Sequence, residues 1–187
     1  MLNALIIGST GATGRELVKL LAECDEFKSV FTVARRHFDY KTEKKINELL
    51  VEDVTNFSED IKADCAFYCF GSTRKQAGSG EAFKDLELKT AANFIKQVSR
   101  SDVKYVGVVY STGADPSSFF LYPQVKGQVE QMFIEAAKEH AFKLRIYRPG
   151  FLECERENKR WAEEVFRWLT PIGNRFCPQS FSISNSY

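Results

Sequence analysis

Three glycines near the start of the chain constrain its fold more than any other feature. Gly8, Gly11 and Gly14 directly follow the apolar run 5–7, and a helical pattern begins as the last of them passes, over residues 15–21. In such a corner the first glycine turns the backbone off the strand, the second allows close approach to a phosphate, and the third packs the helix on the sheet. The helix N-terminus also attracts negative charge. The corner is therefore predicted to bind the pyrophosphate of a dinucleotide.

The spacing of this motif is G-x-x-G-x-x-G, one residue longer than the common G-x-G-x-x-G fingerprint. Taken alone, the spacing also fits an ordinary glycine-rich loop. The strand before it and the helix after it favour the nucleotide site. We expect the whole turn to contact the cofactor, namely Gly8, Ser9, Thr10, Gly11, Ala12, Thr13 and Gly14.

The residues after the second predicted strand select the cofactor. Ser29 to Val33 reads as that strand, and Arg35 and Arg36 follow it. An acidic residue about 20 positions past the glycine turn binds the ribose 2′-hydroxyl of NAD, whereas an arginine accommodates the 2′-phosphate of NADP. Two arginines without a carboxylate predict NADP(H). The alternative is that the pair only forms a solvated rim of the sheet.

Strand and helix patterns alternate along the rest of the chain. Further strands are predicted around 49–51 and at 64–70, 103–110 and 143–147, with helices at about 82–98 and from Tyr122 to about 139. This alternation predicts an α/β fold with a doubly wound parallel sheet, the NAD(P)-binding Rossmann fold. The polar, glycine-broken run 75–80 reads as a mobile surface loop.

Two more strand ends supply expected cofactor contacts. Asp53 and Val54 close the third strand, where the adenine would lie, unless they are plain strand-end residues. Gly71 and Ser72 follow the fourth strand, and a small residue there lets the ribose and pyrophosphate pass close to the backbone. Pro149, in the turn that leaves the sixth strand, completes the expected set.

Composition and charge indicate which kinds of partner and which cellular compartment fit this chain. The 187 residues carry a formal charge of +1, which gives no one-sided positive field for nucleic acid or an anionic membrane, so a small-molecule partner fits better. The chain enters its first strand at once and has no apolar run long enough for a membrane span, so we expect a cytoplasmic protein. The five scattered cysteines indicate reduced thiols. His37 and His140 lie far apart, so we expect no metal site.

Tyr122 and Lys126 are the predicted catalytic pair. Because they are four residues apart on a predicted helix, their side chains share one face. A phenol has an ordinary pKa of about 10 and becomes an effective acid–base catalyst at neutral pH only beside a positive charge, which a lysine supplies. Ser111 or its neighbour Thr112, at the end of the fifth strand, would hold the substrate oxygen.

The Tyr-x-x-x-Lys spacing occurs twice in the chain, because Tyr40 and Lys44 repeat it. That second pair lies in a polar connection with no hydroxyl-bearing strand end ahead of it. Tyr122, by contrast, follows such a strand end and begins a helix. Position therefore favours Tyr122 as the functional tyrosine, the alternative being a half-buried tyrosine over a solvated lysine.

Together these motifs resemble the atypical short-chain dehydrogenases/reductases, and within them the Tat-interacting-protein branch. The resemblance runs from about residue 2 to 156 and rests on the glycine turn, the arginine pair, the turn 70–74, the segment 111–115, the Tyr-x-x-x-Lys-Gly motif and the turn 148–150. It implies NADPH binding, with Tyr122, Lys126 and Ser111 or Thr112 in catalytic roles. It also implies a regulatory protein linked to apoptosis, with protein partners such as nuclear-import receptors and the nucleus as a second location.

Two departures from the family pattern concern the active site and the C-terminal end. The asparagine that many of these reductases use in a central helix has no clear counterpart, because Asn93 is out of phase with it. Residues 1–156 are expected to form the NAD(P)-binding Rossmann domain. Residues 157–187 are expected to form a short helix and an irregular tail, a truncated substrate-side region.

Three functions follow from these motifs. The leading hypothesis is a reductase that uses NADPH to reduce a carbonyl substrate, with Tyr122 as proton donor. The alternative is a non-catalytic NADPH-sensing regulatory protein that acts through protein partners. A sugar-nucleotide epimerase shares the glycine spacing but needs a larger C-terminal lobe.

Overall fold

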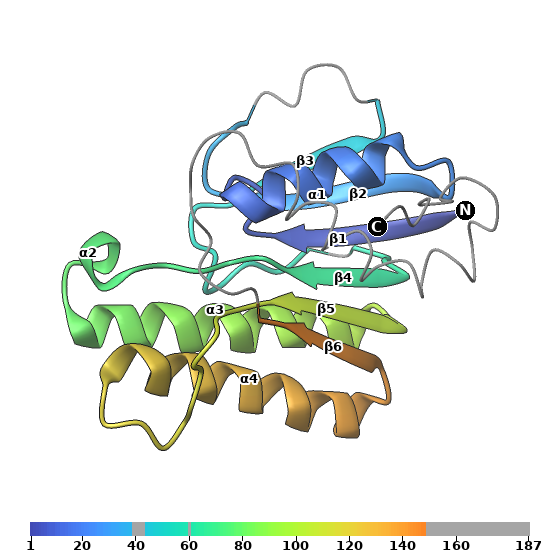
Figure 1. The fold of residues 1–187 in the computed structure, drawn as a ribbon. Coiled ribbons are helices and arrows are strands. Elements are labelled where there is room, and N and C mark those ends of the chain that lie inside the picture. Colours follow the sequence, from blue (N-terminus) through green and yellow to red (C-terminus); the bar gives the residue numbers. More distant parts are fainter. Residues whose placement is uncertain (39–43, 60, 149–187) are drawn as a thin grey trace, which may run out of the picture.

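The computed structural model describes residues 1–38, 44–59 and 61–148. Its centre is one six-stranded sheet with all neighbours parallel, in the order β3-β2-β1-β4-β5-β6 (Figure 1). The strands are β1 (Leu2–Ile7), β2 (Phe27–Ala34), β3 (Ile46–Leu50), β4 (Cys65–Tyr68), β5 (Tyr105–Val109) and β6 (Lys143–Tyr147). This strand order is that of the doubly wound dinucleotide-binding fold, so the predicted fold class is confirmed.

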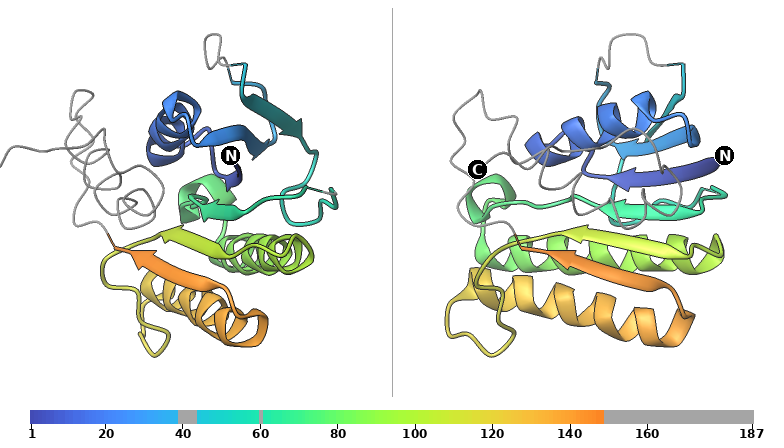
Figure 2. Two further views of the ribbon diagram at one scale, coloured as in Figure 1. Left: turned by 90° about the vertical axis from the view of Figure 1, so that its right-hand side faces the viewer. Right: turned by 45° about the vertical axis from the view of Figure 1, so that its right-hand side comes forward.

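Helices cover both faces of the sheet. Helix α1 (Ala12–Glu23) lies on one face, and α3 (Gly80–Arg100) and α4 (Leu121–His140) lie on the other (Figure 2). Strand β1 is buried between the two layers, and its alternating side chains pack in opposite directions. Leu5 and Ile7 join the core beneath α3 and α4, whereas Ala4 and Ile6 join the core beneath α1.

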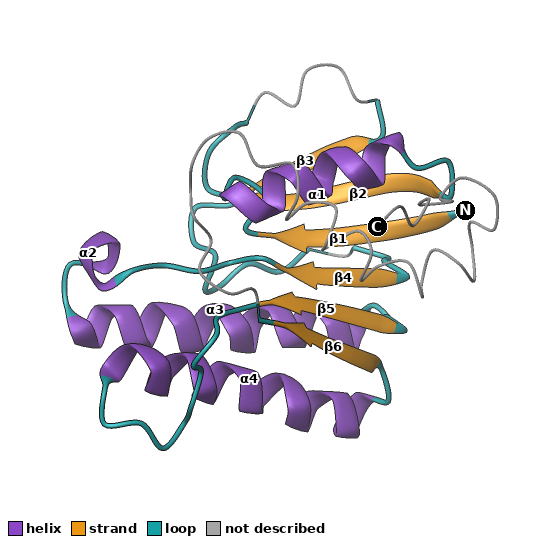
Figure 3. Cartoon of the chain, in the orientation of Figure 1, coloured by secondary structure: helices purple, strands orange, loops and turns teal. Residues whose placement is uncertain are grey.

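The carboxyl ends of the parallel strands share one edge of the sheet, and this edge positions the site. The N-terminal ends of α1, α3 and α4 lie at the same edge (Figure 3). The chain winds in one direction from β1 to β3 and in the other from β4 to β6. Ligands of open α/β sheets bind where this winding reverses, between β1 and β4.

Part of the predicted surface loop 75–80 is a short helix, so that prediction is wrong over its first residues. Helix α2 (Arg74–Ala77) begins with a capping box. The Thr73 hydroxyl accepts from the Gln76 backbone N–H at 3.2 Å, and the Gln76 side chain accepts from the Thr73 N–H at 3.0 Å. These reciprocal bonds satisfy two backbone donors that a loop would leave to water.

The third strand ends earlier than the sequence predicts. Strand β3 covers Ile46–Leu50, and the Asp53 carboxylate accepts from the backbone N–H of Thr55 at 2.8 Å. This local turn competes with continued sheet pairing. Asp53 and Val54 therefore lie just beyond the strand and not in it.

No helix in the described part of the chain is long and apolar enough to cross a bilayer.

Candidate active site and dinucleotide-binding corner

The corner between β1 and α1 has the geometry that the glycine motif predicts. Gly8 has a φ of +80°, and a Cβ atom there would lie 2.4 Å from the carbonyl carbon of Cys69. A Cβ at Gly14 would lie 2.2 Å from the Gly8 carbonyl oxygen. Gly11 is exposed at the start of α1 and provides no side-chain cap. The backbone N–H groups of the first helical turn are thus left for an external acceptor.

Two buried polar groups at this corner also fit a phosphate-bearing ligand. The Ser9 hydroxyl is fully buried and has no hydrogen-bond partner among the described residues. The Arg15 Nε is buried and likewise without a partner within the described ranges. Buried donors of this kind are costly unless something binds them. The residues of the corner therefore fit the pyrophosphate of a dinucleotide.

Positive charge gathers at the end of β2. Arg35 and Arg36 follow the strand directly, and both are exposed. Arg15 lies on α1 but extends to the same place, with its guanidinium carbon 5.7 Å from the ring centroid of Phe38. Sequence reasoning did not identify Arg15 as a third cation here. The sequence did place Arg15 directly after Gly14, in the first turn of the helix that follows the glycine motif.

The two expected adenine contacts differ in exposure. Asp53 is exposed, and hydrogen bonds from Thr55, together with the more distant charges of Lys89 and Arg35, lower the pKa of its carboxyl. Val54 is only 4 % exposed, and its side chain packs in the main core. The Asp53 carboxylate is therefore available at the surface, whereas the Val54 side chain is already covered by the protein.

Lys126 is almost completely buried beneath the turn that follows β4. Its side chain is 4 % exposed, and its Nζ donates to the Glu87 carboxylate at 2.8 Å. The same Nζ lies 4.5 Å from the ring centroid of Tyr110 and 5.6 Å from that of Tyr122. A Cβ at Gly71 would lie 3.4 Å from the ammonium. The absence of a side chain at Gly71 thus leaves the backbone of this turn directly beside the lysine.

Tyr122 is half-exposed at the beginning of α4. Its ring stacks on the buried ring of Phe83 from α3, with centroids 5.7 Å apart and planes at 14°. This contact fixes the ring while 45 % of the residue remains open to solvent. The structure thus brings Tyr122 and Lys126 together on one helix face. A phenol beside an ammonium is suited to proton transfer at a substrate oxygen.

The two candidate hydroxyls lie just beyond β5, at the same edge as Tyr122. The Ser111 hydroxyl donates to the Thr112 carbonyl at 3.3 Å, and the Thr112 hydroxyl donates to the Arg148 carbonyl at 3.3 Å. The loop that carries them packs closely on α4, because a Cβ at Gly127 would lie 2.1 Å from the Pro116 nitrogen. Both hydroxyls remain candidates for holding the substrate oxygen.

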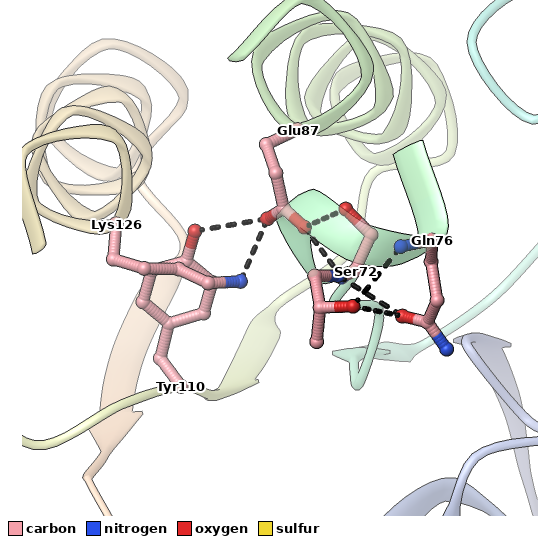
Figure 4. Close-up of polar contacts among 6 residues, drawn as sticks. Ser72, Gln76, Glu87, Tyr110 and Lys126 are labelled. Carbon is pink, nitrogen blue, oxygen red and sulfur yellow. Dashed lines mark hydrogen bonds and ion pairs between the residues drawn. The ribbon is translucent and has the colours of Figure 1, made fainter. Parts of the chain in front are cut away.

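Glu87 is a buried acidic residue beside Lys126 that sequence reasoning did not identify. It is fully buried, and one carboxylate connects Lys126 and Tyr110 on one side with Ser72 on the other (Figure 4). Burial, together with the nearby Tyr68 phenol and Glu87 carboxylate, raises the pKa of Tyr110 far above its ordinary value, so Tyr110 remains a neutral donor. The sequence contained one indication of this role. Glu87 follows Phe83 by four residues, so it lies on the same buried face of α3.

Asn93 does not replace the missing family asparagine. Its side-chain amide donates to the Phe57 carbonyl at 3.1 Å, whereas the α3 residue that contacts Lys126 is Glu87. Pro149 and Tyr40 lie outside the described residues, as does the predicted C-terminal segment 157–187. Within the described ranges, no group of three or more His, Cys, Asp or Glu side chains is arranged to hold a metal ion.

Sequence comparisons connect this site with known families. Residues 3–83 match the family model of the semialdehyde dehydrogenase NAD-binding domain. The mitochondrial protein FMP52 of Candida albicans is 33 % identical over 162 residues, which cover 83 % of this chain and 69 % of that protein. Protein HTATIP2 of Rattus norvegicus is 31 % identical over 173 residues, which cover 88 % of this chain and 69 % of that protein.

Solved structures agree on the fold. The oxidoreductase ylbE of Lactococcus lactis has a TM-score of 0.68 at 18 % identity and covers 90 % of this chain and 85 % of its own. The UDP-Glc/GlcNAc 4-epimerase of Campylobacter jejuni has a TM-score of 0.67 at 14 % identity over 79 % of this chain. The match spans only about half of that epimerase, 53 % of its chain.

The fold and the glycine corner define an NAD(P)-binding domain of the type found in short-chain dehydrogenases/reductases. Within this class, the chain belongs to the branch of atypical members that contains HTATIP2 and the FMP52 proteins. The expected family is thereby confirmed. The expected cytoplasmic and nuclear location is wrong, because the FMP52 relatives are named as mitochondrial proteins.

Proposed function

We propose that this protein reduces a carbonyl substrate with NADPH, and that Tyr122 donates the proton. The observation that carries the proposal is the Tyr122–Lys126 pair, with the lysine Nζ 5.6 Å from the Tyr122 ring centroid, at the edge where the sheet reverses its winding. Both side chains are held by packing: Tyr122 by the Phe83 ring and Lys126 by burial. Such fixed geometry is what proton transfer to a bound carbonyl requires.

Each part of the site has a distinct role in this proposal. The backbone of the turn 8–14 binds the pyrophosphate, and Arg35 and Arg36 bind the 2′-phosphate. Lys126 orients the nicotinamide ribose, and Ser111 or Thr112 holds the substrate oxygen. NADPH supplies the hydride when it is bound. The remaining expected contacts are Asp53, Val54, Gly71, Ser72 and Pro149.

The test compares NADPH binding with turnover across a panel of aldehydes and ketones. Tyr122→Phe should abolish carbonyl-dependent NADPH oxidation while NADPH binding, followed by its fluorescence, persists. Tyr105→Phe is a matched control, because Tyr105 lies at the opposite end of the strands, at the start of β5. Turnover that survives Tyr122→Phe contradicts the proposed proton donor.

Preference for NADP(H) is a separate part of the proposal. Arg35→Ala combined with Arg36→Ala should weaken NADPH binding at least about tenfold and leave NADH binding nearly unchanged, because only NADPH carries the 2′-phosphate. The control removes two positive charges at the opposite edge, Arg100→Ala with Lys104→Ala. Equal losses for the two nucleotides would show that the arginine pair is only a solvated rim.

A non-catalytic NADPH-sensing role is the second candidate. The observation that favours it is the ion pair of Lys126 with Glu87, which offsets the positive charge that would activate Tyr122. Such a protein would act through protein partners, as the family resemblance implies. Tight NADPH binding without turnover of any carbonyl in the panel would support this role.

The location that we propose is mitochondrial, by similarity to the FMP52 relatives. Imaging of the tagged full-length protein against a mitochondrial marker tests it, and a diffuse signal would contradict it.

A further inference from the structure

We infer that Glu87 is the positioning residue of the Tyr122–Lys126 pair. Its carboxylate, carried by α3, fixes the Lys126 ammonium beneath the turn after β4 and links it to that turn through Ser72. The inference rests on the proposed function, because it assigns a role to Glu87 within the same site. Glu87 acts through Lys126 and has no expected contact with the cofactor.

The hydrogen bonds of Glu87 are shared between two parts of the site (Figure 4). Oε2 accepts from Lys126 Nζ at 2.8 Å and from the Tyr110 hydroxyl at 3.3 Å. Oε1 accepts from the Ser72 backbone N–H and from the Ser72 hydroxyl at 2.8 Å. Four donors on a fully buried carboxylate supply the compensation that a buried charge requires.

Lys126 needs such a partner to stay where it is. A lysine has a long flexible stem, and an unpaired ammonium moves toward water wherever a path exists. The exposed Gly71, which has no side chain, lies directly beside the ammonium. The Glu87 carboxylate therefore decides whether the Lys126 ammonium remains near the rings of Tyr110 and Tyr122.

Glu87 also fixes the distance between two sets of expected cofactor contacts. Ser72 and Gly71 belong to the turn after β4, whereas Lys126 belongs to α4. A single side chain from α3 binds both, with one oxygen for each. The geometry therefore assigns to Glu87 the task of holding Lys126 at a fixed separation from the turn after β4.

A second buried glutamate provides the matched control. Glu130 lies on α4 one turn beyond Lys126, is 3 % exposed, and forms an ion pair with Arg148. Removing its charge deprives a different cation of its partner. It should therefore leave Lys126 in place.

The experiment measures how fast Lys126 is acetylated by acetic anhydride in the protein without cofactor. Peptide mass spectrometry gives the rate for Lys126 relative to Lys89, which is exposed on α3. Glu87→Gln should raise this ratio about tenfold, because the loss of a charge-assisted hydrogen bond frees the amine. Glu130→Gln should not change it. In the wild type, NADPH should protect Lys126, and Glu87→Gln should reduce that protection.

Partial unfolding is distinguished by Lys45, whose amine donates to the Cys24 carbonyl at 3.0 Å on the other side of the molecule. Its acetylation should stay constant in a folded variant. If Glu87→Gln does not fold, Glu87→Asp retains the charge but shortens the side chain, and it should give a smaller rise for Lys126. An unchanged Lys126 ratio in the folded variant overturns the inference.

This readout separates the inference from the proposed function. Acetylation of the cofactor-free protein requires no turnover. Absence of activity with every carbonyl would reject the reductase and leave the Glu87 assignment standing. Unchanged Lys126 labelling beside normal activity would reject the Glu87 assignment alone.

Discussion

At the scale of single residues, the glycines of the first corner have separate roles that substitution can distinguish. Gly8 and Gly14 are in contact with other backbone atoms, so a side chain at either has no room. Gly11 has a φ of −75°, which any residue adopts, and it is exposed. The fold therefore requires a glycine at Gly8 and Gly14, whereas at Gly11 the proposed dinucleotide would require it.

We predict that Gly14→Ala lowers the free energy of unfolding by about 2 kcal/mol or more, because the added methyl would overlap the Gly8 carbonyl. Gly11→Ala should change it by less than about 1 kcal/mol and instead weaken NADPH binding. Urea unfolding and NADPH titration of both variants check this. A stable Gly14→Ala protein would contradict the packing argument.

At the scale of elements, the site depends on how α3 and α4 pack against each other and against the loops at the carboxyl edge. Glu87 and Lys126 are 39 residues apart in the sequence and meet only because the two helices lie side by side (Figure 1). Gly127 directly follows the lysine, and the turn at Asp115 and Pro116 rests on it. The helix that carries Tyr122 and Lys126 therefore also positions the loop of candidate hydroxyls.

Gly127→Ala should destabilise the protein by about 2 kcal/mol, because its methyl would lie 2.1 Å from the Pro116 nitrogen and displace the turn. Gln131→Ala, at an exposed position of the same helix, should change the free energy of unfolding by less than about 0.5 kcal/mol. Thermal and urea unfolding of the two variants provide the comparison. Equal stabilities would show that the turn does not depend on Gly127.

At the scale of the whole molecule, the buried thiol of β4 makes stability depend on alkaline pH. Burial raises the pKa of the Cys65 thiol from an ordinary value of 9.0 to about 12. A thiol with a raised pKa stabilises the folded state fully below pH 9.0. This contribution declines as the pH rises toward about 12, because the unfolded chain ionises first.

We therefore predict that, between these two pH values, the free energy of unfolding falls by about 1.4 kcal/mol for each unit of rising pH because of the Cys65 thiol. Cys65→Ala should show a shallower alkaline decline than the wild type, although it starts from a lower stability. Urea unfolding across this range measures both slopes. Parallel slopes would show that the thiol does not contribute.

The sequence by itself determined the features that depend on local spacing. The glycine corner, the order of strands and helices, and the Tyr122–Lys126 pair are periodic or adjacent along the chain, so residue spacing alone places them. The fold class followed from the same alternation. These predictions hold because each requires only the geometry of one strand, one turn or one helix.

The tertiary structure alone decided which distant residues complete the site. Glu87 and Arg15 entered it through contacts between different elements, which no local pattern specifies. The short helix α2 depends on a cap between Thr73 and Gln76 that the sequence contains, but the surrounding polar and glycine residues favoured a loop. Local hydrogen bonds form α2, since none of its residues is buried. Packing instead decided the place of Glu87, because a buried carboxylate requires hydrogen-bond donors from neighbouring elements.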